Sequence, residues 1–243
     1  MPNVLTVRGL KKSYGQKTAL VGIDFDVRAG EVFALIGPNG AGKTTTLRII
    51  ATLLCATDGE IRFLDHDHRR EPDFVREKIS YLPDEAGAYK DMKGLDYLHF
   101  MAAFYAQTPE QEKEFVDRAV AIAELGDRLP TKVGTYSKGM IRKLLLARAL
   151  MTKPALAILD EPTSGLDVIN ALEVREIIRR HVKEGTSVLL SSHNMLEIEF
   201  VSDRVALIAD GRILDSGTPA ELKAKHSAQN LEEVFREEVR RSL

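Results

Sequence analysis

The sequence has one cysteine, no tryptophan and no long apolar run. A single cysteine excludes an intrachain disulfide and any cysteine-based zinc site, which fits a reducing cytoplasm. Cys55 follows Leu53 and Leu54 in an apolar stretch, which predicts a buried, unreactive thiol. No segment approaches the roughly 18 apolar residues of a membrane span, and the first residues, MPNVLTVRGLKK, hold no apolar core of signal-peptide length. We therefore expect a chain that does not enter a membrane by itself, although a partner could hold it there.

The chain also lacks an excess of either positive or negative charge. The chain of 243 residues has 34 Lys and Arg against 36 Asp and Glu, for a net charge of −2. The basic doublets Arg69–Arg70, Arg179–Arg180 and Arg240–Arg241 stand apart from one another. Because a nucleic-acid-binding protein usually concentrates its basic residues on one surface, we expect no nucleic-acid partner. A hydrophobic share of 44% is typical of a globular protein with a sizeable core.

The pattern along the chain predicts an α/β fold. Alternating apolar residues in VLTVRGL and TALVGIDFDV predict antiparallel strands near the N-terminus. The continuous run EVFALIG (31–37) predicts a central strand that is buried on both faces. GEIRFLD (59–65) is typical of an outer strand, and ISYLP (79–83) of a core strand that ends at Pro83.

Helical spacing replaces the strand pattern from about residue 86 to 151. Strands then return at ALAILD (155–160), VLLSS (188–192) and VALIAD (205–210), with helices between them. We therefore predict one mainly parallel sheet that is interrupted by an inserted helical subdomain.

The C-terminal segment, 226–243, predicts an amphipathic helix. NLEEVFREEVRRSL places Leu231, Val234, Phe235 and Val239 on one face. Because glutamates occupy the polar face, packing on its own domain or on a second copy is favoured over an anionic lipid surface.

Residues 37 to 46, GPNGAGKTTT, have the spacing of a phosphate-binding loop. Gly37 to Thr44 match the pattern G-x-x-x-x-G-K-[ST] between a buried strand and a helix that starts near Gly42. Glycines allow backbone N–H groups to turn toward phosphate oxygens, and the helix N-terminus adds its dipole. Lys43 would reach the β- and γ-phosphates, and Thr44 would offer its hydroxyl to Mg²⁺.

Two acids end the strand ALAILD, where Asp160 suits a magnesium ligand. Glu161, one residue further, could act as general base on the attacking water. His193 follows the strand VLLSS. The residues alone leave two readings open for His193: a packing or capping residue, or a group that reaches a γ-phosphate.

In this order the motifs resemble those of an ATP-binding cassette (ABC) ATPase, over about residues 3 to 225. Tyr14 in KSYG resembles the aromatic residue that stacks on adenine, and GPNGAGKT resembles the Walker A loop. YSKGM (136–140) resembles the signature loop, usually LSGGQ. ILDEPTSGLD resembles Walker B with the catalytic glutamate and the D-loop, Ser164–Asp167, and SSHNM carries the switch histidine, His193.

The resemblance implies that ATP and Mg²⁺ are bound between two copies. Lys43, Glu161 and His193 would be catalytic, and Thr44 and Asp160 would hold the metal. The residues implied for ATP binding are Tyr14, Gly37, Pro38, Asn39, Gly40, Ala41, Gly42, Lys43, Thr44, Thr45, Ser137 and Gly139. Since the chain has one GKT and one LDEP, the second half of each site must come from a second ABC ATPase chain. ATP closing the dimer and hydrolysis reopening it would perform mechanical work.

Two departures from the family pattern stand out. Tyr136, Lys138 and Met140 replace the usual Leu, Gly and Gln of the signature, and Lys138 either adds charge toward ATP or faces solvent. In YLPDE, Asp84 stands where most members have the Gln of the Q-loop. Asp84 either reaches the metal, through a water if necessary, or only caps the turn after Pro83.

YLPDEAGAYKDM, YSKGM and LEEVF resemble ATPase subunits of two-component prokaryotic exporters, whose integral-membrane permease is a separate chain. This resemblance implies a peripheral location on the inner face of the cell membrane. A soluble ABC ATPase acting on nucleic acid or ribosomes is the alternative, but it usually has coiled coils, zinc cysteines or two cassettes. A regulatory subunit without hydrolysis is disfavoured by Glu161 and His193. The pair His66 and His68 could bind a metal, although a charged loop is favoured.

Overall fold

The computed structural model describes residues 2–242 and contains two β-sheets. The smaller sheet has the strand order β2-β1-β4-β5 and is antiparallel. Its strands are β1 (Asn3–Tyr14), β2 (Lys17–Arg28), β4 (Asp58–Phe63) and β5 (His66–Asp67). The β1–β2 hairpin turns at Gly15, whose φ of 58° favours glycine. The predicted N-terminal antiparallel sheet is confirmed.

The larger sheet has six strands in the order β10-β9-β3-β8-β7-β6. All neighbours are parallel except β10, which pairs antiparallel with β9 at one edge. The strands are β3 (Val32–Ile36), β6 (Ile79–Leu82), β7 (Leu156–Asp160), β8 (Ser187–Ser192), β9 (Arg204–Ala209) and β10 (Arg212–Gly217). Every residue of β3, β7 and β8 is buried, as their continuous apolar runs predict. The α/β fold with one mainly parallel sheet is confirmed.

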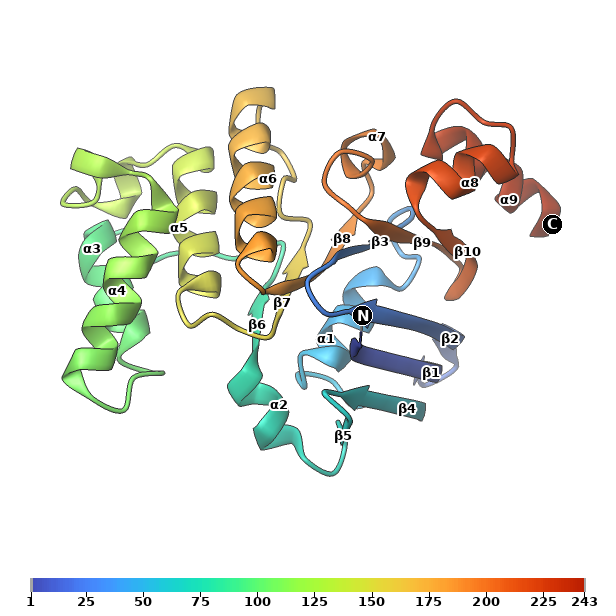
Figure 1. Ribbon diagram of the computed structural model, residues 1–243, viewed down its shortest axis with the longest axis horizontal. Helices are drawn as coiled ribbons and strands as arrows, with labels where there is room; N and C mark the ends of the chain where they lie inside the picture. The colour runs from blue at the N-terminus through green and yellow to red at the C-terminus, as the bar shows by residue number, and fades with distance from the viewer. Residues whose placement is uncertain (1, 243) are drawn as a thin grey trace.

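Helices cover the larger sheet and form a separate group at one end of the molecule (Figure 1). That end group contains α3, α4 and α5, which lie between β6 and β7 in the sequence. The helices are α1 (Lys43–Ile50), α2 (Pro72–Lys78), α3 (Gly94–Ala102), α4 (Pro109–Ala123), α5 (Lys138–Leu150), α6 (Val168–Lys183), α7 (Met195–Ile198), α8 (Pro219–Lys225) and α9 (Leu231–Ser242). Short 3₁₀ turns at Gly126–Arg128 and Val133–Thr135 precede α5.

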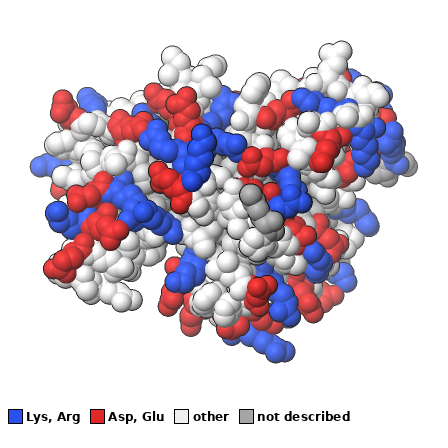
Figure 2. Space-filling model, in the orientation of Figure 1, with Lys and Arg blue, Asp and Glu red and all other residues white. Residues whose placement is uncertain are grey.

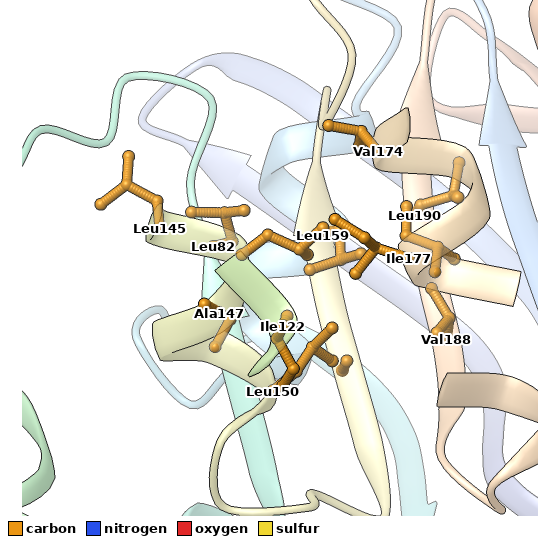
Figure 3. Packing of buried hydrophobic residues seen from close by; sticks show 14 of the residues in the cluster. Leu82, Ile122, Leu145, Ala147, Leu150, Leu159, Val174, Ile177, Val188 and Leu190 are labelled. Carbon is orange, nitrogen blue, oxygen red and sulfur yellow. The ribbon is translucent and has the colours of Figure 1, made fainter. Parts of the chain in front are cut away.

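The main hydrophobic core joins this helical group to the sheet. Figure 3 shows Leu145 and Leu150 of α5 beside Leu82 of β6 and Leu159 of β7, with Ile177 of α6 facing the same sheet. These side chains are at most 1% exposed. This packing is continuous from α5 through β7 to α6, so α5 shares one core with the strands that carry the acidic residues.

Two expectations about the first part of the chain are wrong, the burial of Cys55 and the place of ISYLP in the core of the sheet. The helix after the glycine loop ends at Ile50, because Thr52 takes a left-handed φ of 62°. The chain then runs at the surface, so that Cys55 is exposed rather than buried. ISYLP forms β6, but β6 lies at the edge of the sheet, and only Leu82 in it is fully buried. The pattern of apolar residues in the sequence also did not predict α2 or β10.

The C-terminal helix α9 packs on its own chain, beside α8, α7 and β10 (Figure 1). Leu231 and Val234 are completely buried, which confirms the first of the two predicted packing surfaces. His226, between α8 and α9, has a fully buried side chain with Asp215 Oδ2 2.9 Å from Nε2 and Glu237 Oε2 3.2 Å from Nδ1. Apolar contact and this buried polar cluster together hold α9.

Lys and Arg are interspersed with Asp and Glu on the face seen in Figure 2, which presents no stripe of one sign. Among residues 2–242, no helix is both long and apolar enough to cross a membrane.

Candidate functional site

The candidate site lies where β3, β7 and β8 end. These three strands are parallel neighbours, so their carboxyl ends meet at one edge of the sheet. Ile36 is in register with Ser192, and Asp160 with Ser191. The glycine loop follows β3 directly. Asp160 and Glu161 stand at the end of β7, and Ser192 and His193 at the end of β8. Ligand sites in open α/β sheets form at such an edge.

The glycine loop needs its glycines for two separate reasons. A Cβ at Gly37 would lie 2.0 Å from the carbonyl oxygen of Ile208, which belongs to β9. Gly40 and Gly42 have φ values of 83° and 109°, which other residues rarely adopt. Gly42 is the N-cap of α1 and gives no side-chain cap, so the first N–H groups of the helix remain available to an anion.

Lys43 is buried and is folded back over the loop. Its Nζ donates to Gly37 O at 2.7 Å and to Pro38 O at 3.2 Å. The same Nζ lies 3.6 Å from Glu161 Oε1, although the two residues are far apart in the sequence. The fold thus brings the predicted phosphate-binding lysine and the predicted general base into direct ionic contact.

Asp160 is surrounded by three hydroxyl groups. Thr44 Oγ1 donates to Asp160 Oδ1 at 3.2 Å, Ser191 Oγ donates to the same oxygen at 2.5 Å, and Tyr81 Oη donates to Oδ2 at 3.5 Å. Burial, reinforced by the charge of Asp160, raises the pKa of Tyr81, so this phenol stays protonated and continues to donate. The predicted pair Thr44 and Asp160 is therefore together, as a set of hard oxygen ligands suited to Mg²⁺.

Ser191 and Tyr81 were not singled out by the sequence. The sequence signal for Ser191 was only that a small polar residue stands near the end of the apolar strand VLLSS; its place beside Asp160 follows from strand order. Tyr81 gave none, since it sits within the apolar stretch that became β6.

Glu161 and His193 contact each other. His193 Nδ1 is 2.9 Å from Glu161 Oε2, and the His193 backbone N–H donates to the same oxygen at 3.4 Å. Glu161 has a left-handed φ of 49°, a conformation that costs a non-glycine residue of order 1–3 kcal/mol. Its N–H donates to Ser191 Oγ at 3.1 Å, which helps hold this turn. The strained turn directs the carboxylate back toward Lys43 on one side and His193 on the other.

Asp84 lies in the turn after β6. Its carboxylate Oδ1 is 3.8 Å from Arg142 NH2, and its side chain is 47% exposed. Burial raises the pKa of Asp84, Arg142 opposes that rise, and the charges of Glu161 and Asp160 add to it. Asp84 therefore stands within the electrostatic field of the two acids that end β7.

The predicted signature loop leads into α5, in the helical group rather than at the sheet edge. Ser137 is exposed and is the N-cap of α5, with its Oγ accepting from the N–H of Met140 at 3.2 Å. Gly139 is buried, and a Cβ there would lie 1.9 Å from Asn170 Oδ1 on α6. A larger residue at position 139 would therefore have to displace the Asn170 side chain.

Two of the three unusual signature residues, Tyr136 and Lys138, lie against their own chain. Tyr136 is buried, and its Oη donates to Arg128 O at 2.8 Å, which anchors the loop to the helical group. Lys138 is exposed and reaches over the D-loop, where a Cβ at Gly165 would lie 2.0 Å from its Nζ. Tyr14 ends β1 with its ring 49% exposed, and Lys12 Nζ lies 4.9 Å from the ring centroid.

The histidines of DHDH do not share a site. His66 Nδ1 lies 2.8 Å from Glu71 Oε2, whereas His68 Nε2 lies 2.9 Å from Ile50 O. Within residues 2–242 one group has metal-ligand spacing, Asp215, His226 and Glu238.

The comparisons with known proteins agree with this geometry. The family model described as "ABC transporter" matches residues 20–164. A daunorubicin resistance ATP-binding protein, DrrA3, from Streptomyces coeruleorubidus is 37% identical over 96% of this chain and 74% of its own length. A lantibiotic transport ATP-binding protein, SrtF, from Streptococcus pyogenes is 34% identical over 97% of both chains. The solved structure of an ATP-binding subunit of an ABC transporter superposes with a TM-score of 0.85 at 28% identity, covering 97% of this chain and 99% of that chain.

Proposed function

The chain belongs to the ABC transporter family and is an ATPase of that family, and from this we propose that it is the motor subunit of an exporter whose permease is a separate chain. The observation that carries the proposal is the contact series Lys43–Glu161–His193 beside the glycine loop. These groups come from the ends of three strands, and they meet where a terminal phosphate would lie.

Each group at the sheet edge has a proposed role in hydrolysis. The glycine loop and the start of α1 bind the phosphates through backbone N–H groups. Lys43 moves from Gly37 O and Pro38 O onto phosphate oxygens, which releases its contact with Glu161. Glu161 then accepts a proton from the attacking water, and His193 holds the Glu161 carboxylate in place and faces the γ-phosphate.

The oxygens around Asp160 fit a magnesium ion. Thr44 Oγ1 and Asp160 Oδ1 lie 3.2 Å apart, and both are hard ligands that Mg²⁺ prefers. Mg²⁺ bound there would neutralise charge that develops on the transferred phosphoryl group. Ser191 and Tyr81 would hold the Asp160 carboxylate in position through their hydrogen bonds to Oδ1 and Oδ2.

A second copy would complete each site. Ser137 and the N-terminus of α5 would bind the γ-phosphate of ATP held by another chain, since the helix dipole favours an anion there. Ser137 is exposed, as this role requires. Two copies in head-to-tail arrangement would thus enclose two ATP molecules, and hydrolysis would let them separate.

A row of exposed aromatic rings is the proposed contact with the permease. Tyr89, Phe100, Phe104 and Tyr105 are 58%, 41%, 69% and 52% exposed. The ring centroids of Tyr89 and Phe100 are 5.7 Å apart, and those of Phe100 and Phe104 are 5.1 Å apart. An apolar surface of this kind marks an interaction site. It adjoins the segment from Asp84 to Leu98, so a partner held there would sense the nucleotide site.

The cargo is not fixed by this chain. The names of the two relatives above refer to different compounds, daunorubicin and a lantibiotic, at nearly equal identity to this chain. Substrate recognition therefore belongs to the permease, and export is proposed because both relatives bear names of resistance or transport.

A steady-state hydrolysis assay with Glu161→Gln tests the mechanism. We expect nucleotide binding to remain and turnover to fall by about 10²- to 10⁴-fold, because the base is lost while the glycine loop is intact. The variant should accumulate as an ATP-bound dimer on a sizing column. Glu184→Gln, at the exposed end of α6, is the matched control and should behave as wild type. Unchanged hydrolysis by Glu161→Gln would remove Glu161 from the mechanism.

Crosslinking tests the permease contact. Because Cys55 is exposed, it must first be replaced by Ser, so that each introduced cysteine is the only reactive thiol. In that background, cysteines at Tyr89 or Met92 should crosslink to the membrane protein that co-purifies with the chain. Cysteines at Thr18 or Asp24, on β2, serve as the opposite-face control. Crosslinks from β2 alone would refute this docking surface.

A further inference from the structure

Arg142 is a charged side chain buried beside the candidate site, and no motif accounts for it. It lies on α5, one turn beyond the N-cap Ser137, and its side chain is only 8% exposed. Taking a guanidinium out of water costs several kcal/mol unless charges and hydrogen bonds compensate it. Its partners therefore indicate what it is for.

Those partners belong to the turn after β6. Arg142 NH2 donates to the backbone carbonyl of Asp84 at 3.2 Å and lies 3.8 Å from the Asp84 carboxylate. Burial lowers the pKa of Arg142, and the charges of Asp84, Asp160 and Glu161 oppose that shift. Three carboxylates at the sheet edge thus stabilise one guanidinium that comes from the signature helix.

One donor of Arg142 is left without a partner. NH1 is buried and makes no hydrogen bond to any described residue. An unsatisfied buried donor is costly, of order 1–3 kcal/mol, and such groups usually have a functional reason. The contact with Asp84 is also long for an ion pair, so the guanidinium is not locked into one bidentate arrangement.

We propose that Arg142 is a positioning residue that holds Asp84 at the edge of the nucleotide site and couples that turn to the signature helix α5. The proposal rests on the proposed function, and it explains why an aspartate can replace the usual glutamine here. An amide at position 84 would remove the one carboxylate of these three that lies within ion-pair distance of Arg142, at 3.8 Å. Asp84 and Arg142 therefore work as a pair, joined by charge and by the backbone hydrogen bond.

The consequence concerns communication within one chain. Asp84 would respond to the metal and phosphate bound by its own glycine loop. Ser137, on the same helix as Arg142, would contact the nucleotide bound by the other copy. A shift of Asp84 toward its own site would pull on Arg142 and so move α5, which links the two sites of the dimer through one side chain.

A double-mutant cycle tests the pairing, with Arg142→Gln, Asp84→Asn and the double variant. We expect Arg142→Gln to lower kcat about tenfold and to raise the Mg²⁺ concentration for half-maximal rate about threefold, from loss of one charge-assisted contact. In the Asp84→Asn background the same change should cost less than about twofold, because the residue that it positions has already lost its charge. Binding of a fluorescent ATP analogue without metal should change little in any variant.

A rescue experiment separates positioning from packing. Asp84→Gln alone should be more impaired than Asp84→Gln combined with Arg142→Gln, because the single change leaves a buried charge without its partner. Arg148→Gln is the matched control: Arg148 lies on the same helix and also donates from NH2 to a backbone carbonyl, Tyr81 O in β6, at 3.3 Å. We expect it to lower the melting temperature without moving the Mg²⁺ dependence.

Equal fold losses from Arg142→Gln in both backgrounds would overturn the proposal, as would a lowered melting temperature with unchanged kcat and Mg²⁺ dependence. The same Mg²⁺ shift in Arg148→Gln would also overturn it. None of these outcomes touches the proposed function, which depends instead on the loss of turnover in Glu161→Gln.

Discussion

Replacing Gly37 with alanine would disturb the glycine loop through one identified atom. The added Cβ would lie 2.0 Å from Ile208 O, 3.1 Å from Ile208 C and 3.2 Å from Ile208 Cγ2. The carbonyl oxygen and carbonyl carbon of Ile208 belong to the backbone of β9 and cannot rotate away. Ordinary contact begins at 3.4 Å, so either β9 or the loop must shift by roughly 1.4 Å.

Neither side can shift freely. The N–H of Gly37 donates to Ser192 O at 3.3 Å, and β3 is paired with β9 up to Ile36 and Leu207. Overpacking of this kind costs about 1–3 kcal/mol, and a clash with backbone belongs at the upper end. For a chain of this size, about 3 kcal/mol corresponds to a fall in melting temperature of roughly 6–12 °C.

The function of the loop should suffer as well. Gly37 O is an acceptor for Lys43 Nζ, so displacing it also displaces the lysine. A misplacement of about 1 Å at a reacting centre can cost on the order of 10²-fold in rate. We therefore expect Gly37→Ala to lose most of its hydrolysis even at temperatures where it remains folded.

Thermal unfolding and hydrolysis at a temperature below both transitions measure these effects separately. Gly87→Ala is the control, because no atom lies within 4 Å of a Cβ there and its φ is outside the left-handed region. Gly40→Ala isolates backbone strain, since its φ is 83° but the space is open. A melting temperature for Gly37→Ala within 2 °C of Gly87→Ala would refute the steric reasoning.

Three further predictions concern other parts of the molecule. Burial alone would raise the pKa of Asp215. Hydrogen bonds from His226 and Lys225 outweigh this effect and hold the pKa below its usual value. Asp215 therefore stabilises the fold above the pKa of an unfolded aspartate, and this stabilisation is lost as the pH falls. Asp215→Asn should melt below wild type at pH 7, and the difference should close below about pH 4 in a series of melts at different pH. A constant difference across that range would contradict this assignment. Exposed Cys55 should react with a thiol reagent in the native protein, to one equivalent, before any unfolding; reaction only in denaturant would show that it is buried. Tyr136→Phe removes the hydrogen bond to Arg128 O and should cost about 1 kcal/mol by thermal unfolding with little loss of hydrolysis. A loss of hydrolysis without loss of stability would give Tyr136 a direct role at the nucleotide.

Several elements were predictable because local pattern and tertiary position agree. The fully buried strands β3, β7 and β8 have no exposed face, so their apolar runs carry the information directly. Where the tertiary position of a residue did not match its local pattern, the prediction was wrong or missing. Leu53 is apolar but 64% exposed, because the left-handed Thr52 turns the chain out of the helix and onto the surface. Seven-residue α2 is too short for a clear helical period, and it went unnoticed.

The sequence alone determined the chemical inventory: a glycine loop with Lys43 and Thr44, two acids at a strand end, and one histidine after another strand. Motif spacing determines these because the loop and the strand ends are local structures. Only the tertiary structure decided which groups touch. Strand order places β3 beside β8 and β8 beside β7, and this brings Lys43, Glu161 and His193 into contact across more than a hundred residues of chain. The pairing of Arg142 with Asp84 likewise depends on how α5 packs on β6, because contacts between distant segments follow from packing and not from spacing.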